Sequence, residues 1–284
     1  MMGLDSRRKQ FNRSIASLLI GVIAVVFLLP IGFVVMNSFK GKLFISSDPF
    51  SFPSAAEGTL VGLDNYISGV EKTGFFNAFG WSLFITVFSV IVIVLFTSMT
   101  GWYITRVKKT YTKIIYYALV FSMIVPFQMV MFTMSKFANI LHLDNPFGII
   151  LIYLGFGAGL STFMFSGFVK SIPVDIEEAA LIDGCNPIRT YFKVVFPILR
   201  PTAITVAILN TMWIWNDYLL PYLLLDSDHR TIPIVIQYLK GGYGSIDMGA
   251  MMAMLTLAII PIIVFYLSCQ KYIIKGVVAG AVKG

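Results

Sequence analysis

Few residues of this sequence have side chains suited to catalysis or metal binding. The 284 residues include 14 Asp and Glu, two His and two Cys. His142 and His229 stand alone, without a second ligand at the spacing of a metal site, and Cys185 and Cys269 are interpreted as structural thiols. No GxxxxGK[ST] phosphate loop occurs in the sequence. We therefore expect no enzyme activity, no catalytic residue, no metal site and no cofactor held by this chain.

The charged residues that could recognise a partner or a solute fall in two places. Residues 171–200 carry seven of them, namely Asp175, Glu177, Glu178, Asp183, Arg189, Lys193 and Arg200. Asp217 instead stands alone within a long apolar run. A carboxylate at the centre of a membrane-spanning helix costs about 2.5 to 3.5 kcal/mol, and less toward an interface, so it usually faces a bundle interior or a cavity. We expect Asp217 to face away from lipid.

Membrane-spanning helices must position these residues, because the composition excludes a soluble domain. The AVILMFWYC set makes up 57% of the chain and charged residues 12%, whereas about 25% of residues are charged in soluble domains. A helix needs about 20 apolar residues to cross the hydrocarbon core. Six stretches qualify, at 14–36, within 73–105, and at 114–135, 145–169, 201–225 and 248–270. The sequence predicts an all-α, multi-pass membrane protein with six transmembrane helices.

The distribution of Lys and Arg predicts the orientation of these helices. With the basic segment 1–13 in the cytoplasm and the first span uncleaved, fifteen of the 21 Lys and Arg residues fall on the cytoplasmic side and six outside. Cytoplasmic loops of membrane proteins carry such an excess. We expect both termini in the cytoplasm, with 271–284 as a tail and 14–270 as the membrane domain. The net charge of +7 is then a topology signal and does not indicate nucleic-acid binding.

Two external segments are interpreted as loops. The longest, at about 37–76, is rich in Gly, Pro and Ser and is expected to form an irregular external cap. The glycine-rich stretch 241–244 is interpreted as an external turn, with docking of a binding protein as a secondary hypothesis.

The cytoplasmic loop 171–200 has the pattern of two short helices. Pro173, followed by acidic residues, is typical of a helix N-terminus, and Gly184 of a helix end. Asn186 and Pro187 repeat the start signal, and Pro197 is expected to end the second helix. The second helix carries one apolar face, formed by Ile188, Tyr191, Phe192 and Val195. A two-helix elbow, residues 173–197, with an apolar face favours a docking element, although a loop that packs back on its own membrane ends has the same pattern.

The elbow also carries a recognisable signature. Glu178, Ala179, Ala180, Gly184 and Pro197 stand at the spacing of E-A-A-x3-G-x9-I-x-L-P. This sequence resembles the EAA motif of ABC importer permeases, with Val194 in place of Ile and Phe196 in place of Leu. Both changes keep an apolar residue.

Matches over almost the whole chain narrow the resemblance. The segments 36–40, 124–126, 215–221, 231–233 and 275–284 look like the carbohydrate permeases related to the second maltose-transporter subunit. The resemblance implies a type I ABC importer permease fold and alternating access in a bacterial-type cytoplasmic (inner) membrane. It also implies four partners: a second homologous permease, a cytoplasmic ABC ATPase dimer that binds ATP and Mg, an extracytoplasmic sugar-binding protein, and the carbohydrate itself.

The resemblance assigns coupling to the ATPase to the elbow. In this hypothesis Ile188, Tyr191, Phe192 and Val195 seat in a groove of the ATPase, Glu178 and Arg189 make polar contacts at its rim, and Gly184 gives the bend. The coupling residues are Glu178, Ala179, Ala180, Gly184, Ile188, Arg189, Tyr191, Phe192, Val195 and Pro197.

A second residue set suits a sugar pathway. Asn and Asp bind sugar hydroxyls and aromatic rings bind C–H faces, so Gln128, Asn210, Trp213, Asn216 and Asp217 are candidates. Asn and Gln in spans also bond neighbouring helices, and Trp213 fits an interfacial anchor as well. At the level of the whole chain, a self-sufficient secondary transporter and an importer permease for a non-sugar solute stay open as alternatives.

Overall fold

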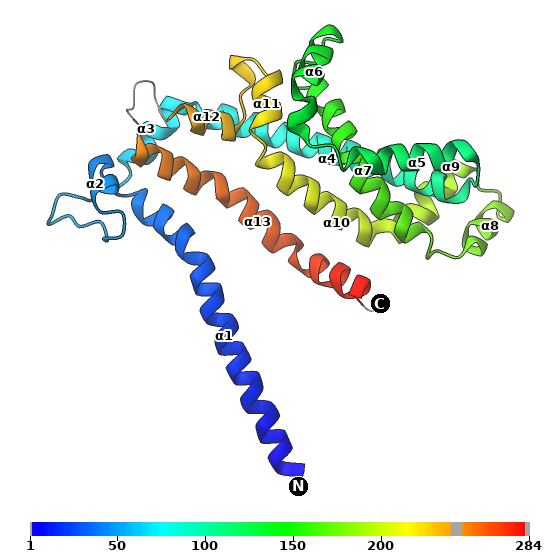
Figure 1. Ribbon diagram of the computed structural model, residues 1–284, viewed down its shortest axis with the longest axis horizontal. Helices are drawn as coiled ribbons and strands as arrows, with labels where there is room; N and C mark the ends of the chain where they lie inside the picture. The colour runs from blue at the N-terminus through cyan, green and yellow to red at the C-terminus, as the bar shows by residue number, and fades with distance from the viewer. Residues whose placement is uncertain (1, 240–245, 282–284) are drawn as a thin grey trace. The chain divides into compact units, whose positions relative to one another are not determined.

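Figure 1 presents the computed structural model of the chain, which describes the backbone of residues 2–239 and 246–281 and the side chains of 13–239 and 246–272. Among these residues the regular elements are helices, apart from an isolated antiparallel bridge between Lys40 and Leu60. The stretch 241–244 lies outside the described residues, as do the side chains of the C-terminal segment 275–284. The helices are α1 Met2–Asn37, α2 Lys42–Ser47, α3 Asp64–Thr73, α4 Phe75–Arg106, α5 Thr110–Ser122, α6 Phe127–Ile140, α7 Gly148–Val169, α8 Val174–Ile182, α9 Pro187–Thr190, η1 Tyr191–Val195, α10 Phe196–Trp215, α11 Leu219–Leu224, η2 Ser227–His229, α12 Ile232–Tyr238 and α13 Met248–Ala281.

Five helices in the described residues are long and apolar enough to cross a membrane. They are Arg13–Asn37, Phe75–Arg106, Gly148–Val169, Pro187–Trp215 and Met248–Tyr272. Four correspond closely to predicted spans. The fifth predicted span is displaced: the helix begins at Pro187 and ends at Trp215, and the short α11 follows after a break at 216–218.

The third predicted span, 114–135, is not one straight helix. It is a pair of helices, Thr110–Ser122 and Phe127–Ile140, that meet at an angle of 109°. Pro126 lies in the break with φ −63° and ψ 137°. Proline lacks an N–H and disfavours helical backbone at the residue before it, which explains why α5 ends before this point. If the bent pair counts as one span, the described residues contain six.

The chain divides into two compact units, Met1–Phe75 with Ile236–Ile259 and Phe76–Val235 with Ile260–Gly284. In the first unit the predicted cap, about 37–76, is more regular than its sequence suggests, because α2 and α3 lie within it. α3 packs against the start of α13, where a Cβ on Gly249 would lie 2.4 Å from Asn65 Oδ1. Asn65 Nδ2 in turn donates to the carbonyls of Ser38 and Lys40 at 2.8 and 2.9 Å.

The second unit is built around α7, which packs against α5 and α10. Small residues on α7 permit close approach, as they do in many membrane bundles. A Cβ on Gly159 would lie 2.6 Å from the Leu119 carbonyl, and one on Gly157 would lie 2.8 Å from Ile93. The core includes Tyr153 and Phe165 of α7 and continues to Tyr191 in the elbow. The elbow is thus attached to the core that packs the spanning helices.

Candidate functional site

The first half of the elbow is α8, and its end depends on Gly184. Gly184 has φ +79°, in the left-handed region that favours glycine. Its N–H donates to the Leu181 carbonyl and the Cys185 N–H to the Ala180 carbonyl, both at 3.0 Å. These two bonds form a Schellman motif, which satisfies carbonyls at the helix end. The structure confirms that α8 stops here and that the chain turns.

The second half begins as its sequence predicts but does not end at Pro197. Asn186 Oδ1 accepts a hydrogen bond from the Arg189 N–H at 2.8 Å, and Pro187 is the first helical residue. The chain then passes through a π-helical turn, Tyr191–Val195, where the Phe196 N–H donates to the Tyr191 carbonyl. It continues as α10, with Pro197 in the first turn. The prediction that Pro197 ends the helix is wrong, because the chain continues through the π-helical turn and past Pro197 to Trp215.

The apolar face of this second half divides between inside and outside. Tyr191 and Val195 are 1% and 0% exposed and belong to the core of the chain. The Tyr191 hydroxyl lies 2.6 Å from Ser98 Oγ of α4. Ile188 and Phe192 are 67% and 48% exposed. The expectation of one four-residue docking face therefore does not fit Tyr191 and Val195, which are buried in the core of the chain.

Exposed apolar residues on α8 extend the outward surface of the elbow. Leu181 is 51% and Ile182 86% exposed, the latter the highest of these fractions. α8 packs against α9, which carries Ile188. Glu178, Ala179 and Arg189 are exposed as well, whereas Ala180 is buried. We name Leu181, Ile182, Ile188 and Phe192 the elbow patch.

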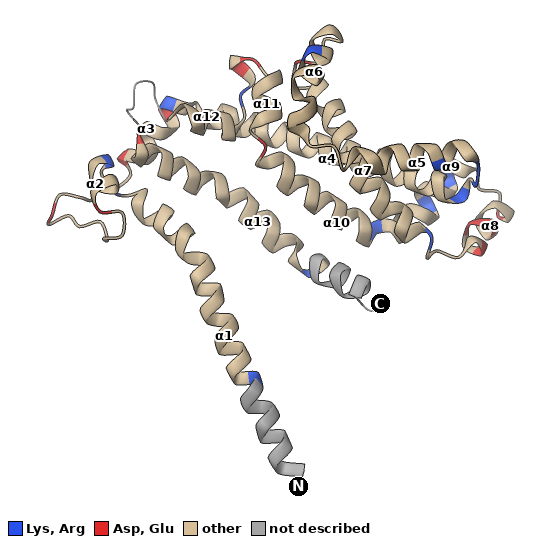
Figure 2. Cartoon of the chain, viewed as in Figure 1, with Lys and Arg blue, Asp and Glu red and all other residues tan. Residues whose placement is uncertain are grey.

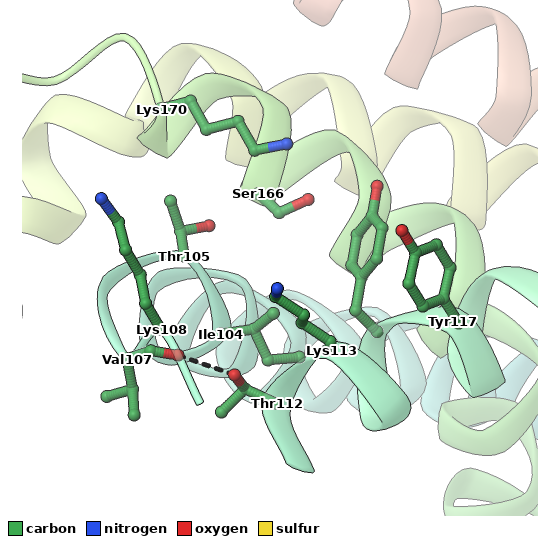
Figure 3. A pocket seen from close by; sticks show the side chains of 10 residues that line it. Ile104, Thr105, Val107, Lys108, Thr112, Lys113, Tyr117, Ser166 and Lys170 are labelled. Carbon is green, nitrogen blue, oxygen red and sulfur yellow. Dashed lines mark hydrogen bonds between the residues drawn. The ribbon is translucent and has the colours of Figure 1, made fainter. Parts of the chain in front are cut away.

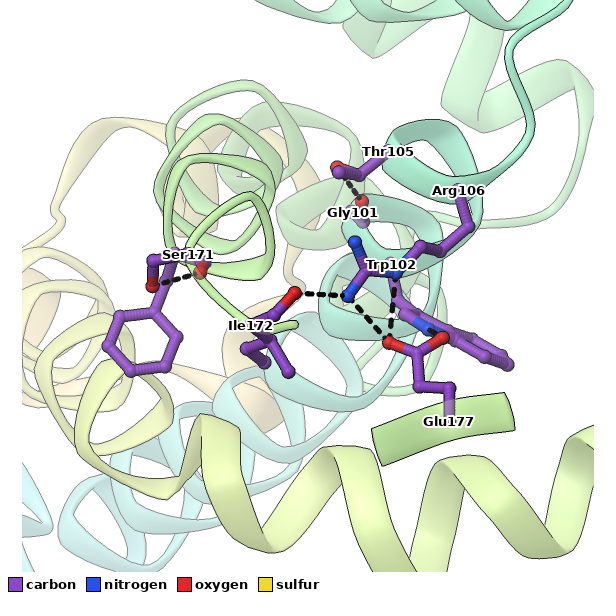
Figure 4. A network of polar contacts seen from close by, with 8 residues as sticks. Gly101, Trp102, Thr105, Arg106, Ser171, Ile172 and Glu177 are labelled. Carbon is purple, nitrogen blue, oxygen red and sulfur yellow. Dashed lines mark hydrogen bonds and ion pairs between the residues drawn. The ribbon is translucent and has the colours of Figure 1, made fainter. Parts of the chain in front are cut away.

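A buried ion pair fixes α8 to the end of α4, as Figure 4 shows. Arg106 Nε and Nη2 donate to Glu177 Oε1 at 2.8 and 2.7 Å. Trp102 Nε1 donates to Oε2 of the same carboxylate at 2.9 Å, and Arg106 Nη2 reaches the Ile172 carbonyl at 2.9 Å. The side chains of Arg106 and Glu177 are 18% and 9% exposed. This cluster, which we name the Glu177 clamp, ties the elbow to a spanning helix by charge-assisted hydrogen bonds.

Charges of opposite sign occupy different parts of this end of the second unit. Figure 2 shows acidic residues on α8 and basic residues around α5, α9 and the start of α10.

Two carboxylates away from the elbow, outside the predicted spans, have lowered pKa values. The pKa of Asp226 is lowered chiefly by its hydrogen bond with His229. Burial alone would raise the pKa of Asp247, but its ion pair with Lys72 lowers it. Both carboxylates are therefore ionised at neutral pH.

Three of the candidate pathway residues, which lie in α10 or just after it, contact α7. Asp217 Oδ2 accepts a hydrogen bond from the Tyr153 hydroxyl at 3.0 Å, and its Oδ1 accepts the Leu219 N–H at 3.0 Å. The Trp213 ring meets the Tyr153 ring edge to face, with centroids 5.5 Å apart. Asn210 is 5% exposed and donates to Ser161 Oγ at 3.2 Å. Its amide bridges α10 and α7, which matches the structural alternative for this residue.

The other two pathway candidates are exposed. Asn216 Nδ2 donates to the Met212 carbonyl of its own helix at 2.7 Å. Gln128 lies in the first turn of α6 and is exposed. Among the described residues, no hydrogen bond joins the side chain of either one to Asp217.

Four residues that the sequence did not single out prove to be structurally central. Trp102 and Arg106 stand four residues apart at the end of a span, but their acidic partner Glu177 lies more than 70 positions away in the sequence, so no local spacing indicates the clamp. Glu177 resembles its exposed neighbour Glu178 in sequence, and no pattern separates them. Tyr153 is 0% exposed within an apolar helix, and its hydroxyl is the one feature that distinguishes it from the apolar residues around it.

The fold and the elbow together define a class of protein, a multi-pass helical membrane protein that presents a short two-helix loop with exposed apolar side chains. A family model described as "Binding-protein-dependent transport system inner membrane component" matches residues 94–278. The chain belongs to this family, whose members are transport permeases and not enzymes.

Similar proteins carry sugar-transport names. The probable starch degradation products transport system permease protein AmyC of Thermoanaerobacterium thermosulfurigenes is 39% identical over 92% of this chain and 94% of its own. The multiple sugar-binding transport system permease protein MsmG of Streptococcus mutans is 36% identical over 93% and 95%. A bacterial ABC transporter involved in the import of the acidic polysaccharide alginate has a chain that superimposes with TM-score 0.75, at 23% identity, over 94% of this chain and 98% of that one. This likeness confirms the predicted importer permease fold.

Proposed function

We propose that the chain is the permease subunit of an ATP-driven, binding-protein-dependent importer of di- or oligosaccharides in a bacterial cytoplasmic membrane. Its family and the names of its relatives support this proposal. ATP and Mg bind to a separate ATPase dimer, and a second homologous permease completes the pathway. An extracytoplasmic binding protein delivers the sugar.

The elbow patch is the observation that carries the proposal. Two isoleucines, Ile182 and Ile188, are 86% and 67% exposed. They lie in a loop that is predicted to be cytoplasmic, where no lipid would cover them. Burying such a side chain contributes about 1.5 to 3 kcal/mol. A cytoplasmic protein with an apolar groove is the partner that this surface fits, with Glu178 and Arg189 at the rim.

The connectivity of the elbow supplies a route from ATP to the pathway. Closure of the ATPase dimer moves the elbow, and α10 moves with it because Pro187–Trp215 is one continuous helix. The Glu177 clamp makes α4 follow. The far end of α10 carries Trp213 and leads to Asp217, so the same motion changes access to these groups. ATP therefore drives the transition by binding one state of the assembly more tightly than the other.

The group around Tyr153 suits a carbohydrate. Trp213 is 40% exposed and presents an aromatic face, and Asp217 is partly buried beside it. An aromatic ring beside a carboxylate can bind the C–H face and the hydroxyls of a sugar. Gln128 and Asn216 remain candidates for polar contacts farther along the pathway.

Purification and reconstitution test the proposal. The tagged chain, expressed together with the other subunits of its transporter, is expected to copurify with an ATPase. Reconstituted in liposomes with the binding protein outside, the complex is expected to take up oligosaccharide only when ATP is inside. The double variant Ile182→Asp, Ile188→Asp is expected to lower ATPase copurification more than tenfold.

Phe52→Asp provides the matched control, because Phe52 is 81% exposed but lies in the external cap. It should leave copurification unchanged. Uptake without ATP would favour the secondary transporter instead, and normal copurification of the double variant would refute the role of the elbow patch.

A further inference from the structure

A basic pocket of about 400 Å³ lies in the second unit where α4 ends, α5 begins and α7 ends. Figure 3 shows its lining, with Lys170 on one side and Lys108 and Lys113 on the other. The lining residues comprise three lysines, five residues with hydroxyls and no acid, and they are Ile104, Thr105, Val107, Lys108, Thr112, Lys113, Tyr116, Tyr117, Ser166 and Lys170.

The three ammonium groups have no anionic partner in the described part of the chain. The ion pairs found there involve other residues, and the lysine with a defined neighbour, Lys170, lies 5.9 Å from the centroid of the Tyr116 ring. Like charges around one space repel, and a bound anion relieves that repulsion. The pocket therefore favours a negatively charged ligand.

The hydrogen-bond donors left free in the pocket suit a phosphate group. Thr105, Thr112 and Ser166 already donate their hydroxyl hydrogens to backbone carbonyls at 2.7 to 3.0 Å. The hydroxyls of Tyr116 and Tyr117 have no hydrogen-bonded acceptor in the described residues. The groups that remain are three ammonium groups and two phenol hydroxyls. All five can donate hydrogen bonds, and only the two phenol oxygens can also accept one.

The position of the pocket indicates a lipid as the source of the phosphate. It lies at the ends of three helices that the Lys and Arg distribution places at the cytoplasmic surface, where headgroups lie. Ile114 and Tyr117 on α5 are 63% and 68% exposed, so apolar surface continues from the basic pocket. A free inorganic phosphate has no apolar group that would pack on this surface, whereas the acyl chain of a lipid does. Basic pockets between spanning helices are a known form of anionic headgroup site.

We propose that this pocket binds the phosphate of an anionic phospholipid headgroup, with Lys108, Lys113 and Lys170 as its cationic ligands. The bound lipid joins the ends of α4 and α7, the two helices that lead to the Glu177 clamp and to α8. The proposal needs the predicted topology but not sugar import, so either can fail without the other.

Native mass spectrometry of the delipidated transporter, titrated with phosphatidylglycerol or phosphatidylcholine, tests the site. The wild-type assembly is expected to retain phosphatidylglycerol in preference to phosphatidylcholine. The triple variant Lys108→Gln, Lys113→Gln, Lys170→Gln should bind phosphatidylglycerol about 100-fold more weakly, since each lysine near an anionic surface contributes about fivefold.

A control of equal charge separates the pocket from general attraction. Lys109→Gln, Lys193→Gln, Arg200→Gln removes three exposed cations that the topology places on the same side but that do not line the pocket, and it should keep phosphatidylglycerol binding within about twofold. Equal loss in both triple variants would overturn the proposal. So would displacement of the lipid by millimolar inorganic phosphate, which would assign the site to a soluble anion. The three single variants provide the same comparison if the triple variant does not fold, with about fivefold weaker binding expected in each.

Discussion

Burial separates Glu177 from the other acids of the loop. Its carboxylate accepts three hydrogen bonds, from Arg106 and Trp102, whereas Asp175, Glu178 and Asp183 are exposed. Removing one partner of a buried pair leaves the other charge without compensation, which costs about 3 to 5 kcal/mol. We therefore expect the free energy of unfolding to fall steeply when only one of the two charged residues of the Glu177 clamp is removed.

A double-mutant cycle tests this reasoning. Glu177→Ala and Arg106→Ala are each expected to lower the free energy of unfolding by about 3 to 5 kcal/mol, and the double variant by less than the sum, because no unpaired charge remains. Thermal unfolding of the purified transporter measures the stabilities, and ATP-driven uptake reports whether the elbow still follows α4.

Asp175→Asn supplies the comparison on the same helix. Asp175 is exposed in the first turn, where a charge contributes about 0.3 to 1 kcal/mol through the helix dipole. Additive losses in the cycle would show that Arg106 and Glu177 do not act as a pair.

Residue by residue, the sequence located the elbow better than it located its exposed side. Helical periodicity predicts one face formed by Ile188, Tyr191, Phe192 and Val195, but Tyr191 and Val195 are buried whereas Ile188 and Phe192 are exposed. The pattern does not distinguish a core inside the chain from a groove on a partner. Tyr191 resolves the ambiguity only through its contact with Ser98, a residue 93 positions away. Non-local contacts of this kind have no signature in a single sequence.

At the scale of elements, the turn between α8 and α9 depends on one backbone conformation. A Cβ at Gly184 would meet nothing within 4 Å, so space does not constrain the position, and the positive φ does. Left-handed backbone costs about 1 to 2 kcal/mol for a residue with a Cβ.

Gly184→Ala is therefore expected to destabilise the elbow by about 1 to 2 kcal/mol, Gly184→Val by more, and Gly184→Asn by less, since Asn tolerates this conformation best among the three. ATP-driven uptake should fall in the same order, measured at equal amounts of reconstituted protein. Gly167→Ala is the matched control, because Gly167 lies in α7 with helical backbone and open space. If Gly184→Val matched this control, the bend would not need left-handed backbone.

Two prolines show why element boundaries were harder to predict than element existence. The sequence predicts a span that runs through Pro126, but α5 and α6 meet there at an angle of 109°. It predicts a helix end at Pro197, but the π-helical turn before it lets the helix continue. At both positions proline lacks a backbone N–H donor. Whether the helix then bends or continues depends on the packing of the neighbouring residues.

At the scale of the whole molecule, orientation rests on the distribution of Lys and Arg, and the two cysteines test it. Cys185 in the elbow and Cys269 near the end of the sixth span are free thiols, and both are expected on the cytoplasmic side. A membrane-impermeant maleimide should leave the chain unlabelled in intact cells or spheroplasts and label Cys185 in inverted vesicles. Cys185→Ser should remove that labelling.

Ala56→Cys, in the exposed external cap, is the positive control and should react in intact spheroplasts. Labelling of Cys185 from the outside would reverse the topology, and with it the assignment of the elbow to the cytoplasm and of the basic pocket to the inner headgroup layer.

Much of the molecule followed from its sequence because the physical constraints there are strong. Apolar length identified the spans, and the spacing of Glu178, Ala179, Ala180 and Gly184 identified the family. Pairings across the chain, such as Tyr153 with Asp217 and Arg106 with Glu177, required the fold.

The continuity of Pro187–Trp215 has a mechanical consequence. Beyond the π-helical turn, α10 from Phe196 to Trp215 is about 29 Å long at 1.5 Å per residue. A tilt of about 10° at its elbow end displaces the far end by about 5 Å, close to the 5.4 Å pitch of one helical turn. In the proposed transport cycle, a small rotation of the elbow would thereby become a side-chain-sized displacement beside Trp213, without a relay of intermediate contacts.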